Sequence, residues 1–236
     1  MKRADVAEFY RLLADRTPNP ETELESVNGF TLLVAVVLSA QATDAGVNLA
    51  TRDLFALADT PEKMVALGEE RLKEHIKTIG LFNTKAKNVI ALSRGLIEQH
   101  KGEVPADRDA LEALPGVGRK TANVVMNTAF GAETFAVDTH VFRVGNRTGL
   151  APGKTPVEVE EKLDRVTPPP YRRDAHHLLI LHGRYVCKAR KPECWRCVVV
   201  TLCRYTPKTP PPGEGPAAIR PAAARKAKRP VKGLSS

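Results

Sequence analysis

The sequence predicts an all-α fold. Apolar residues recur at the spacing of an amphipathic helix along most of the chain, and the alternation typical of a half-buried strand is nearly absent. Short segments with Gly, Pro or Asn separate the periodic stretches, as in a compact helical protein. With 236 residues, 42% of them hydrophobic, the chain can form one large domain or two modest ones, each with a core.

The helices are predicted from the N-terminus onward. Val6, Phe9, Tyr10 and Leu13 follow the i, i+3, i+4, i+7 pattern of a buried helix face, and residues 17–20, with two prolines, end that helix. The remaining helices are predicted over residues 29–40, 45–57, 61–67, 69–78, 84–99, 109–113, 118–129, 139–147, 156–166 and 174–186.

The C-terminal segment, residues 206–236, is rich in Pro, Ala, Gly, Lys and Arg, which predicts a disordered tail. Seven cations and Glu214 give this tail +6 of the net charge of +9, so residues 1–205 are only mildly basic. An acidic partner would therefore be bound by local basic clusters, and the tail would add a non-specific attraction that salt screens.

We expect a cytoplasmic protein that does not contact a membrane. Residues 1–16 carry charges at helical spacing and have no uninterrupted apolar stretch, unlike a secretory signal. The longest nearly apolar run, residues 30–42, is too short to cross a bilayer and is predicted to be a buried helix.

Residues 114–125, LPGVGRKTANVV, place a Pro-Gly-Val-Gly turn between two predicted helices. A nucleotide-binding P-loop is excluded, because it needs a glycine where Ala113 stands, a Gly-Lys pair that Arg119 interrupts here, and a preceding strand. Gly116 and Gly118 instead let another backbone approach, and successive N–H groups in such a turn can bind a DNA phosphate. An ordinary turn between helices is the alternative.

Two aspartates are predicted to be N-caps. Asp109 opens the segment DALE, which has the form of a capping box, and Asp138 precedes a helical run with Val141 and Val144. A carboxylate at a helix N-terminus is held in a fixed orientation. Capping by Asp138 is therefore compatible with a catalytic role.

Lys120 lies in the first turn of the helix that follows the hairpin. Ala122, Val125, Met126 and Ala129 form the stripe that is expected to face a core. At about 100° per residue, Lys120 lies roughly 170° from that stripe. It is therefore expected to point away from its own core, either as a solvated surface lysine or as a functional group.

The hairpin segment is similar in sequence to a second segment of the chain. Residues 79–90, IGLFNTKAKNVI, align with residues 114–125 without gaps and share Lys, Asn and Val at the seventh, tenth and eleventh positions. Each segment places a turn before a helix. We interpret them as two related hairpins, with a chance match of three identities in twelve as the alternative.

The four cysteines of the chain fall within 17 residues: Cys187, Cys194, Cys197 and Cys203. They predict one local metal centre rather than disulfides, because nothing else in the sequence indicates secretion. A zinc ribbon usually has two C-x-x-C pairs and only one is present, whereas four thiolates can also hold a [4Fe–4S] cluster. The loop between the first two cysteines carries Lys188, Arg190 and Lys191, which form either a solvated surface or a phosphate contact.

Together, LPGVGRKTANVV, AVDTH (136–140) and the cysteine pattern CKARKPECWRCVVVTLC resemble the endonuclease III family, DNA glycosylases of the helix-hairpin-helix superfamily. The segments LSAQATD (38–44), IKTIGLFNTKAKN (76–88) and HGRYVC (182–187) extend the resemblance. It therefore covers roughly residues 1–205.

The resemblance implies a DNA glycosylase that also has AP lyase activity. The family's catalytic lysine matches Lys120, its catalytic aspartate matches Asp138, and its hairpin glycines match Gly116 and Gly118. The lysine attacks the sugar C1′ as a neutral amine, a form that the helix N-terminus and the neighbouring Arg119 would favour. The resulting Schiff base permits β-elimination, and the implied substrates are oxidised or ring-saturated pyrimidines in duplex DNA.

The resemblance also implies how DNA is held and how the chain is organised. Gln41 and Leu81 match residues that fill the space left by an extruded base, and a [4Fe–4S] cluster on the four cysteines shapes the basic loop. The implied fold is two helical domains flanking a DNA-binding cleft, a central domain of residues 23–131 and a cluster domain of residues 1–22 and 132–205. We expect a monomer that acts on damaged double-stranded DNA.

Other members of the superfamily fit less well. Adenine glycosylases generally lack a lysine at the position of Lys120 and carry an extra C-terminal domain, and mismatch thymine or uracil glycosylases also lack the lysine. The 8-oxoguanine glycosylases lack the cluster. A non-catalytic DNA-binding or redox-sensing protein on the same scaffold is the remaining alternative, and the pair of Lys120 and Asp138 argues against it.

Overall fold

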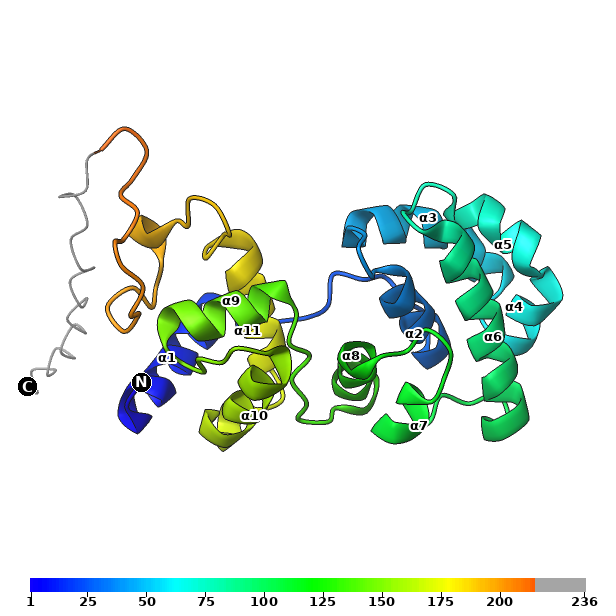
Figure 1. Ribbon diagram of the computed structural model, residues 1–236, viewed down its shortest axis with the longest axis horizontal. Helices are drawn as coiled ribbons and strands as arrows, with labels where there is room; N and C mark the ends of the chain where they lie inside the picture. The colour runs from blue at the N-terminus through cyan, green and yellow to red at the C-terminus, as the bar shows by residue number, and fades with distance from the viewer. Residues whose placement is uncertain (215–236) are drawn as a thin grey trace, which may run out of the picture.

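The computed structural model describes residues 1–214, which fold into helices joined by turns and loops, with no strand among them (Figure 1). The helices are α1 (Arg3–Arg16), α2 (Gly29–Leu38), α3 (Asp44–Leu57), α4 (Pro61–Leu67), α5 (Glu69–Ile76), α6 (Phe82–His100), α7 (Arg108–Glu112), α8 (Arg119–Phe130), α9 (Thr139–Thr148), α10 (Pro156–Val166) and α11 (Ala175–Tyr185), with the 3₁₀ helices η1 (Pro169–Tyr171) and η2 (Cys194–Arg196). The predicted all-α class is confirmed. Residues 215–236, most of the predicted tail, lie outside the described residues.

The buried apolar side chains form two separate clusters. The first comes from α2 to α8 and the loops around them, between Leu24 and Ala136. The second comes from α1, α9, α10 and α11 with neighbouring loops, and reaches Val199. In Figure 1 the helices that carry the second cluster lie at the left, and most of the helices that carry the first lie at the right. Helix α1 packs against α11, so the N-terminus of the chain joins its C-terminal half.

Helix α8 is buried on more than the one face that the sequence predicts. Ala122 is buried as expected, but Ala129 is exposed, whereas Asn123 and Asn127 on the opposite side are buried. The Asn127 amide donates to the backbone carbonyl of Arg173 at 3.0 Å. The helix lies between the two clusters (Figure 1), so its second face is an interface rather than a solvated surface.

Residues with short polar side chains precede several helices and cap their N-termini, as expected. Thr43 caps α3 and Thr60 caps α4. Helix α7 is capped by Asp107, whose carboxylate accepts a backbone N–H at 2.8 Å, so the prediction of Asp109 is wrong by two residues. Asp109 lies instead in the first turn, where the helix dipole favours a carboxylate.

Most helix ends differ from the prediction by one or two residues. Helices α4 and α10 have the predicted bounds, whereas α2 ends at Leu38 because the chain turns at Ser39 and Gln41 has a left-handed backbone. The short η1 and η2 were not predicted, since three residues carry no periodic signal. Within residues 1–214, no helix combines the length and the apolar character needed to cross a membrane.

Candidate active site and nucleic-acid interface

The turn between α7 and α8 leaves open backbone N–H groups at the start of α8. Gly116 has a φ of 79°, and a Cβ atom there would lie 2.8 Å from the Cβ atom of Asn88, so the fold requires glycine. Gly118, the N-cap of α8, differs: no atom of the described residues lies within 4 Å of a Cβ atom placed on it. No side chain among residues 1–214 caps this first turn, so its N–H groups can bind an anion.

The turn between α5 and α6 places Leu81 beside the loop of Gln41. Both residues have a left-handed backbone, with φ of 61° and 56°, and both side chains are exposed. A Cβ atom placed on Gly80 would lie 4.0 Å from the carbonyl oxygen of Gln41, so the two loops are adjacent. A leucine that is 60% exposed in a conformation non-glycine residues rarely adopt indicates a use outside the core.

Lys120 and Asp138 line one cleft of about 740 Å³ between the two clusters. Lys120 is the second residue of α8 and is exposed. Asp138 is the N-cap of α9, as predicted, and its Oδ1 accepts hydrogen bonds from the N–H groups of His140 at 2.9 Å and Val141 at 2.8 Å. Gln41 lines the same cleft, so three residues predicted from distant segments meet there.

Arg119 does not act on its neighbour Lys120 as expected. Its Nε and Nη2 donate to the two carboxylate oxygens of Glu160 in α10, at 2.9 and 2.8 Å. The hydrogen bond that Arg119 donates to this carboxylate raises the pKa of Arg119. The paired carboxylate offsets the guanidinium charge, so Arg119 does not add to the positive field at Lys120. Its two hydrogen bonds instead join α8 to α10.

Arg184 joins the two parts of the molecule at another edge of the cleft. Its guanidinium forms ion pairs with Asp44 at the start of α3 and with Glu23, and the hydroxyl of Tyr185 donates to the same Glu23. Asp44 and Arg184 both line the cleft. Both residues lie in segments that carry the family resemblance, LSAQATD and HGRYVC, but no local pattern in the sequence indicates that they pair.

A second pocket adjoins the cleft and shares Lys120 with it. His176, from α11, lines this pocket and is only 2% exposed. Its Nδ1 has no hydrogen-bond partner among residues 1–214. Burial, reinforced by the charges of His177, Lys120 and Arg184, lowers the pKa of His176 to about 3. The ring is therefore neutral near pH 7. No pattern in the local sequence singles out His176 as a pocket residue.

The four cysteines border a single small cavity: Cys187, Cys194, Cys197 and Cys203. None forms a disulfide within residues 1–214. Arg147 of α9 donates to the Cys187 sulfur at 3.9 Å, and Lys208, at the start of the predicted tail, donates to the Cys203 carbonyl at 2.8 Å.

No three His, Cys, Asp or Glu side chains in the described chain are grouped closely enough to hold a metal ion. Four thiols around one cavity nevertheless fit an iron–sulfur cluster, which distributes its ligands over several irons.

The loop of residues 188–193 presents part of the predicted basic surface. Arg190 and Lys191 are exposed. Lys188 is exposed too, but its Nζ pairs with Glu193 at 2.7 Å, which offsets its charge. The surface available to a phosphate is therefore centred on Arg190 and Lys191.

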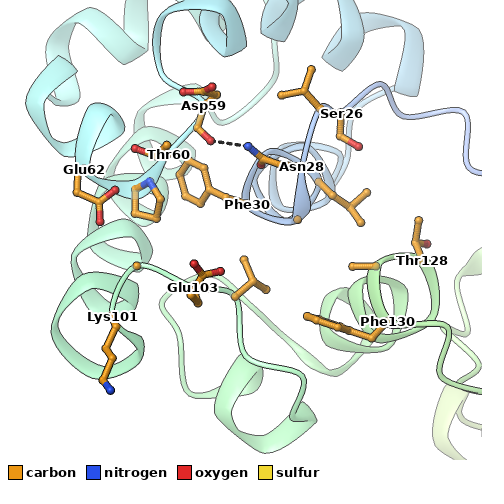
Figure 2. Close-up of a pocket in the computed structure, with 17 residues that line it drawn as sticks. Ser26, Asn28, Phe30, Asp59, Thr60, Glu62, Lys101, Glu103, Thr128 and Phe130 are labelled. Atoms are coloured by element: carbon orange, nitrogen blue, oxygen red, sulfur yellow. Dashed lines mark hydrogen bonds between the residues drawn. The ribbon is translucent and has the colours of Figure 1, made fainter.

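A further hollow of about 720 Å³ lies between the starts of α2 and α4 and the end of α8 (Figure 2). Figure 2 shows Asn28, Phe30, Asp59 and Phe130 around it, and the Asn28 amide donates to the Asp59 carbonyl at 2.8 Å. Among the described residues, none of its lining side chains is a predicted site residue. The cleft with Lys120 is therefore the candidate active site.

Similarity to known proteins identifies the family of this chain. A model described as "HhH-GPD superfamily base excision DNA repair protein" matches residues 34–169. The chain belongs to this superfamily. Endonuclease III of Escherichia coli (strain K12) is 58% identical over 208 residues, which cover 88% of this chain and 99% of that protein. The predicted endonuclease III family is thereby confirmed.

Two solved complexes of endonuclease III with DNA are similar over 86% of this chain and 96% of theirs. One is a trapped covalent intermediate, an estranged-adenine complex, with a TM-score of 0.82 and 44% identity. The other is a non-covalent complex with a TM-score of 0.82 and 45% identity. The chain is a base excision repair enzyme, a DNA glycosylase with AP lyase activity.

Proposed function

We propose that this enzyme removes oxidised or ring-saturated pyrimidines from duplex DNA, with Lys120 as the nucleophile and Asp138 as its partner. The observation that carries the proposal is that the N-termini of α8 and α9 bring these two residues into one cleft. The similarity to endonuclease III bound to DNA supports damaged DNA as the partner. A non-catalytic DNA-binding protein would not require such a pair.

The reaction follows from the two side chains. The neutral amine of Lys120 forms a bond to C1′ of the extruded nucleotide, and the glycosidic bond breaks with its electron pair leaving on the base, which then takes up a proton. The Asp138 carboxylate, held by two backbone N–H groups, stabilises the positive charge that develops at the sugar. The bound nitrogen then loses a proton and the C1′–O4′ bond breaks, with its electron pair going to O4′, which gives the Schiff base. The Schiff base acidifies the C2′ proton, removal of this proton expels the 3′-phosphate, and water releases Lys120.

The same proposal assigns the DNA contacts. The open N–H groups around Gly118 bind a phosphate, while Gln41 and Leu81 occupy the space left by the extruded nucleotide and offset its lost stacking. Arg190 and Lys191 contact the backbone further along the duplex. Gly116 lets the hairpin turn approach α6, and so supports the phosphate site from within the protein.

The extruded base enters the pocket that adjoins the cleft. The base is attached to C1′, the carbon that Lys120 attacks, so it must lie beside this lysine. Lys120 lines both the cleft and the pocket. On the measure that gives the cleft about 740 Å³, this pocket holds about 50 Å³, so it is a narrow recess that Lys120 lines in part.

The four cysteines hold a [4Fe–4S] cluster in this proposal, and their position around one cavity supports it. When bound, the cluster is a structural crosslink and supplies no electrons to base removal. The Arg147 side chain already donates to the backbone carbonyl of Lys188 at 2.7 Å and holds the basic loop against α9. The cysteine loop thereby presents Arg190 and Lys191 to DNA.

The proposed organisation is a central domain of residues 23–131 and a cluster domain of residues 1–22 and 132–205. The two separate apolar clusters support these boundaries. We also propose that the enzyme acts as a monomer in the bacterial cytoplasm, as expected for a relative of bacterial repair enzymes. The tail of residues 206–236 adds a weak, salt-screened attraction to DNA.

Borohydride trapping tests the nucleophile. Duplexes with an oxidised pyrimidine or an abasic site are incubated with wild type, Lys120→Ala and, as a control, Lys63→Ala, which removes a lysine of α4 that pairs with Asp59. We expect a covalent adduct with wild type and the control, and a loss of at least about 1000-fold with Lys120→Ala while DNA binding is retained. An undiminished adduct with Lys120→Ala would refute the assignment.

A further inference from the structure

His176 lies in an unusual position for a buried histidine. It lines the pocket that Lys120 also lines, with 2% of its surface exposed. Its Nδ1 finds no hydrogen-bond partner in the part of the chain that the structure describes. Its ring contacts that of His177 edge to face, at 5.0 Å between centroids. Because native proteins satisfy nearly all buried polar atoms, an unpaired imidazole beside the nucleophile indicates a ligand that completes it.

We propose that His176 donates an imidazole N–H hydrogen bond to the pyrimidine as the base departs from C1′. This inference rests on the proposed function, since it requires the base to enter this pocket. When the glycosidic bond breaks, its electron pair moves to N1 of the base and the charge spreads onto O2. A fixed N–H donor in a site that excludes water stabilises that charge. The base takes up its proton from solvent after it leaves the pocket, so His176 itself gains and loses none.

The surroundings of His176 suit a hydrogen-bond donor rather than an acid. The charged or titratable groups that line the pocket are His177 and Arg184 of α11, Lys120 of α8, Asp44 of α3, and Glu21 and Glu23 of the preceding linker. Arg184 pairs with Asp44 and Glu23, which offsets their negative charge. Burial lowers the pKa of His176 to about 3, so the imidazole remains neutral near pH 7.

Two substitutions separate hydrogen bonding from packing. His176→Gln keeps an N–H donor on a side chain of similar reach, and His176→Met fills a similar volume without a donor. Single-turnover rates are measured on a duplex with a ring-saturated pyrimidine and on one with a preformed abasic site, which has no base to lose. Thermal unfolding checks the fold of each variant, and His176→Phe serves as a second donor-free replacement if His176→Met does not fold.

We expect base excision to fall about 10- to 100-fold in His176→Met and to stay within about threefold of wild type in His176→Gln. We expect β-elimination at the abasic site to be unchanged in both. Equal losses on the two duplexes would indicate a structural role and overturn the proposal, as would wild-type excision by His176→Met. A wild-type enzyme that cleaves abasic sites but removes no pyrimidine would refute the proposed substrate and, with it, this inference.

Discussion

The hairpins α5–α6 and α7–α8 share one backbone design. In each turn a backbone N–H donates to the carbonyl three residues earlier, from Ile79 at 2.9 Å in the first and from Leu114 at 3.1 Å in the second. The residues at the matched turn position, Leu81 and Gly116, both have a left-handed backbone. The sequence similarity between residues 79–90 and 114–125 therefore reflects a structural repeat, not a chance match.

The lysines at the matched position differ in their surroundings. Lys85 is 5% exposed, and its Nζ has no hydrogen-bond partner among residues 1–214, whereas Lys120 is exposed in the cleft. Two additional non-helical residues, Val117 and Gly118, precede α8, so Lys120 is the second residue of its helix and Lys85 the fourth. A small change in where the helix begins thus separates a buried lysine from one that can reach a substrate.

The largest expected effect concerns the two glycines of the second hairpin. Gly116→Ala places a Cβ atom at positive φ and 2.8 Å from Asn88, so we expect a loss of about 1–3 kcal/mol of unfolding free energy. Gly118→Ala meets no protein atom and has an extended backbone, so its stability should change by less than about 0.5 kcal/mol. Urea unfolding measures both.

The loss of DNA affinity should be larger in Gly118→Ala than in Gly116→Ala, the reverse of their order in loss of stability. A methyl group at Gly118 lies where a phosphate is proposed to approach, and we expect the dissociation constant to rise about tenfold, equivalent to 1.4 kcal/mol. Fluorescence titration with a duplex that contains an abasic-site analogue measures the dissociation constant. The comparison is the dissociation constant of Gly116→Ala, corrected for its folded fraction. Unchanged affinity in Gly118→Ala would mean that this hairpin does not bind the backbone.

The sequence predicts what depends on near neighbours. The helices, the Asp138 cap and the clustering of the cysteines all follow from residues a few positions apart, and the structure has them. The cap of α7 was misplaced only because Asp107 and Asp109 both suit an N-cap. Catalytic roles came from the resemblance rather than from the pattern, since a lysine on a polar helix face is usually solvated.

The remaining features depend on partners far along the chain. Glu160, which pairs with Arg119, is 41 residues away, and Asp44 lies 140 residues before Arg184. The second buried face of α8 exists only because another cluster packs against it. A hydrophobic stripe read from one helix identifies the contact with its own core and cannot show a second, polar contact.

Leu81→Gly tests whether the first hairpin holds its leucine for DNA rather than for stability. Glycine adopts φ of 61° without strain, and the leucine is 60% exposed, so we expect stability to rise by up to about 1 kcal/mol. Excision of a pyrimidine should slow, while β-elimination at a preformed abasic site should change less. Slower unfolding with undiminished excision would show that the exposed side chain has no part in base extrusion.

The smallest expected effect concerns Lys85, the buried counterpart of Lys120. Burial lowers the pKa of Lys85 below its usual 10.5, so the unfolded chain binds more protons below that pH, and wild-type stability should rise as the pH approaches 10.5. Lys85→Met removes the titration, and its stability advantage over wild type should shrink as the pH rises toward about 10.5. Lys87→Met, exposed on the same helix, is the control. Parallel stability profiles for Lys85→Met and wild type would show that the buried amine is already satisfied, which would remove the contrast between the two hairpin lysines.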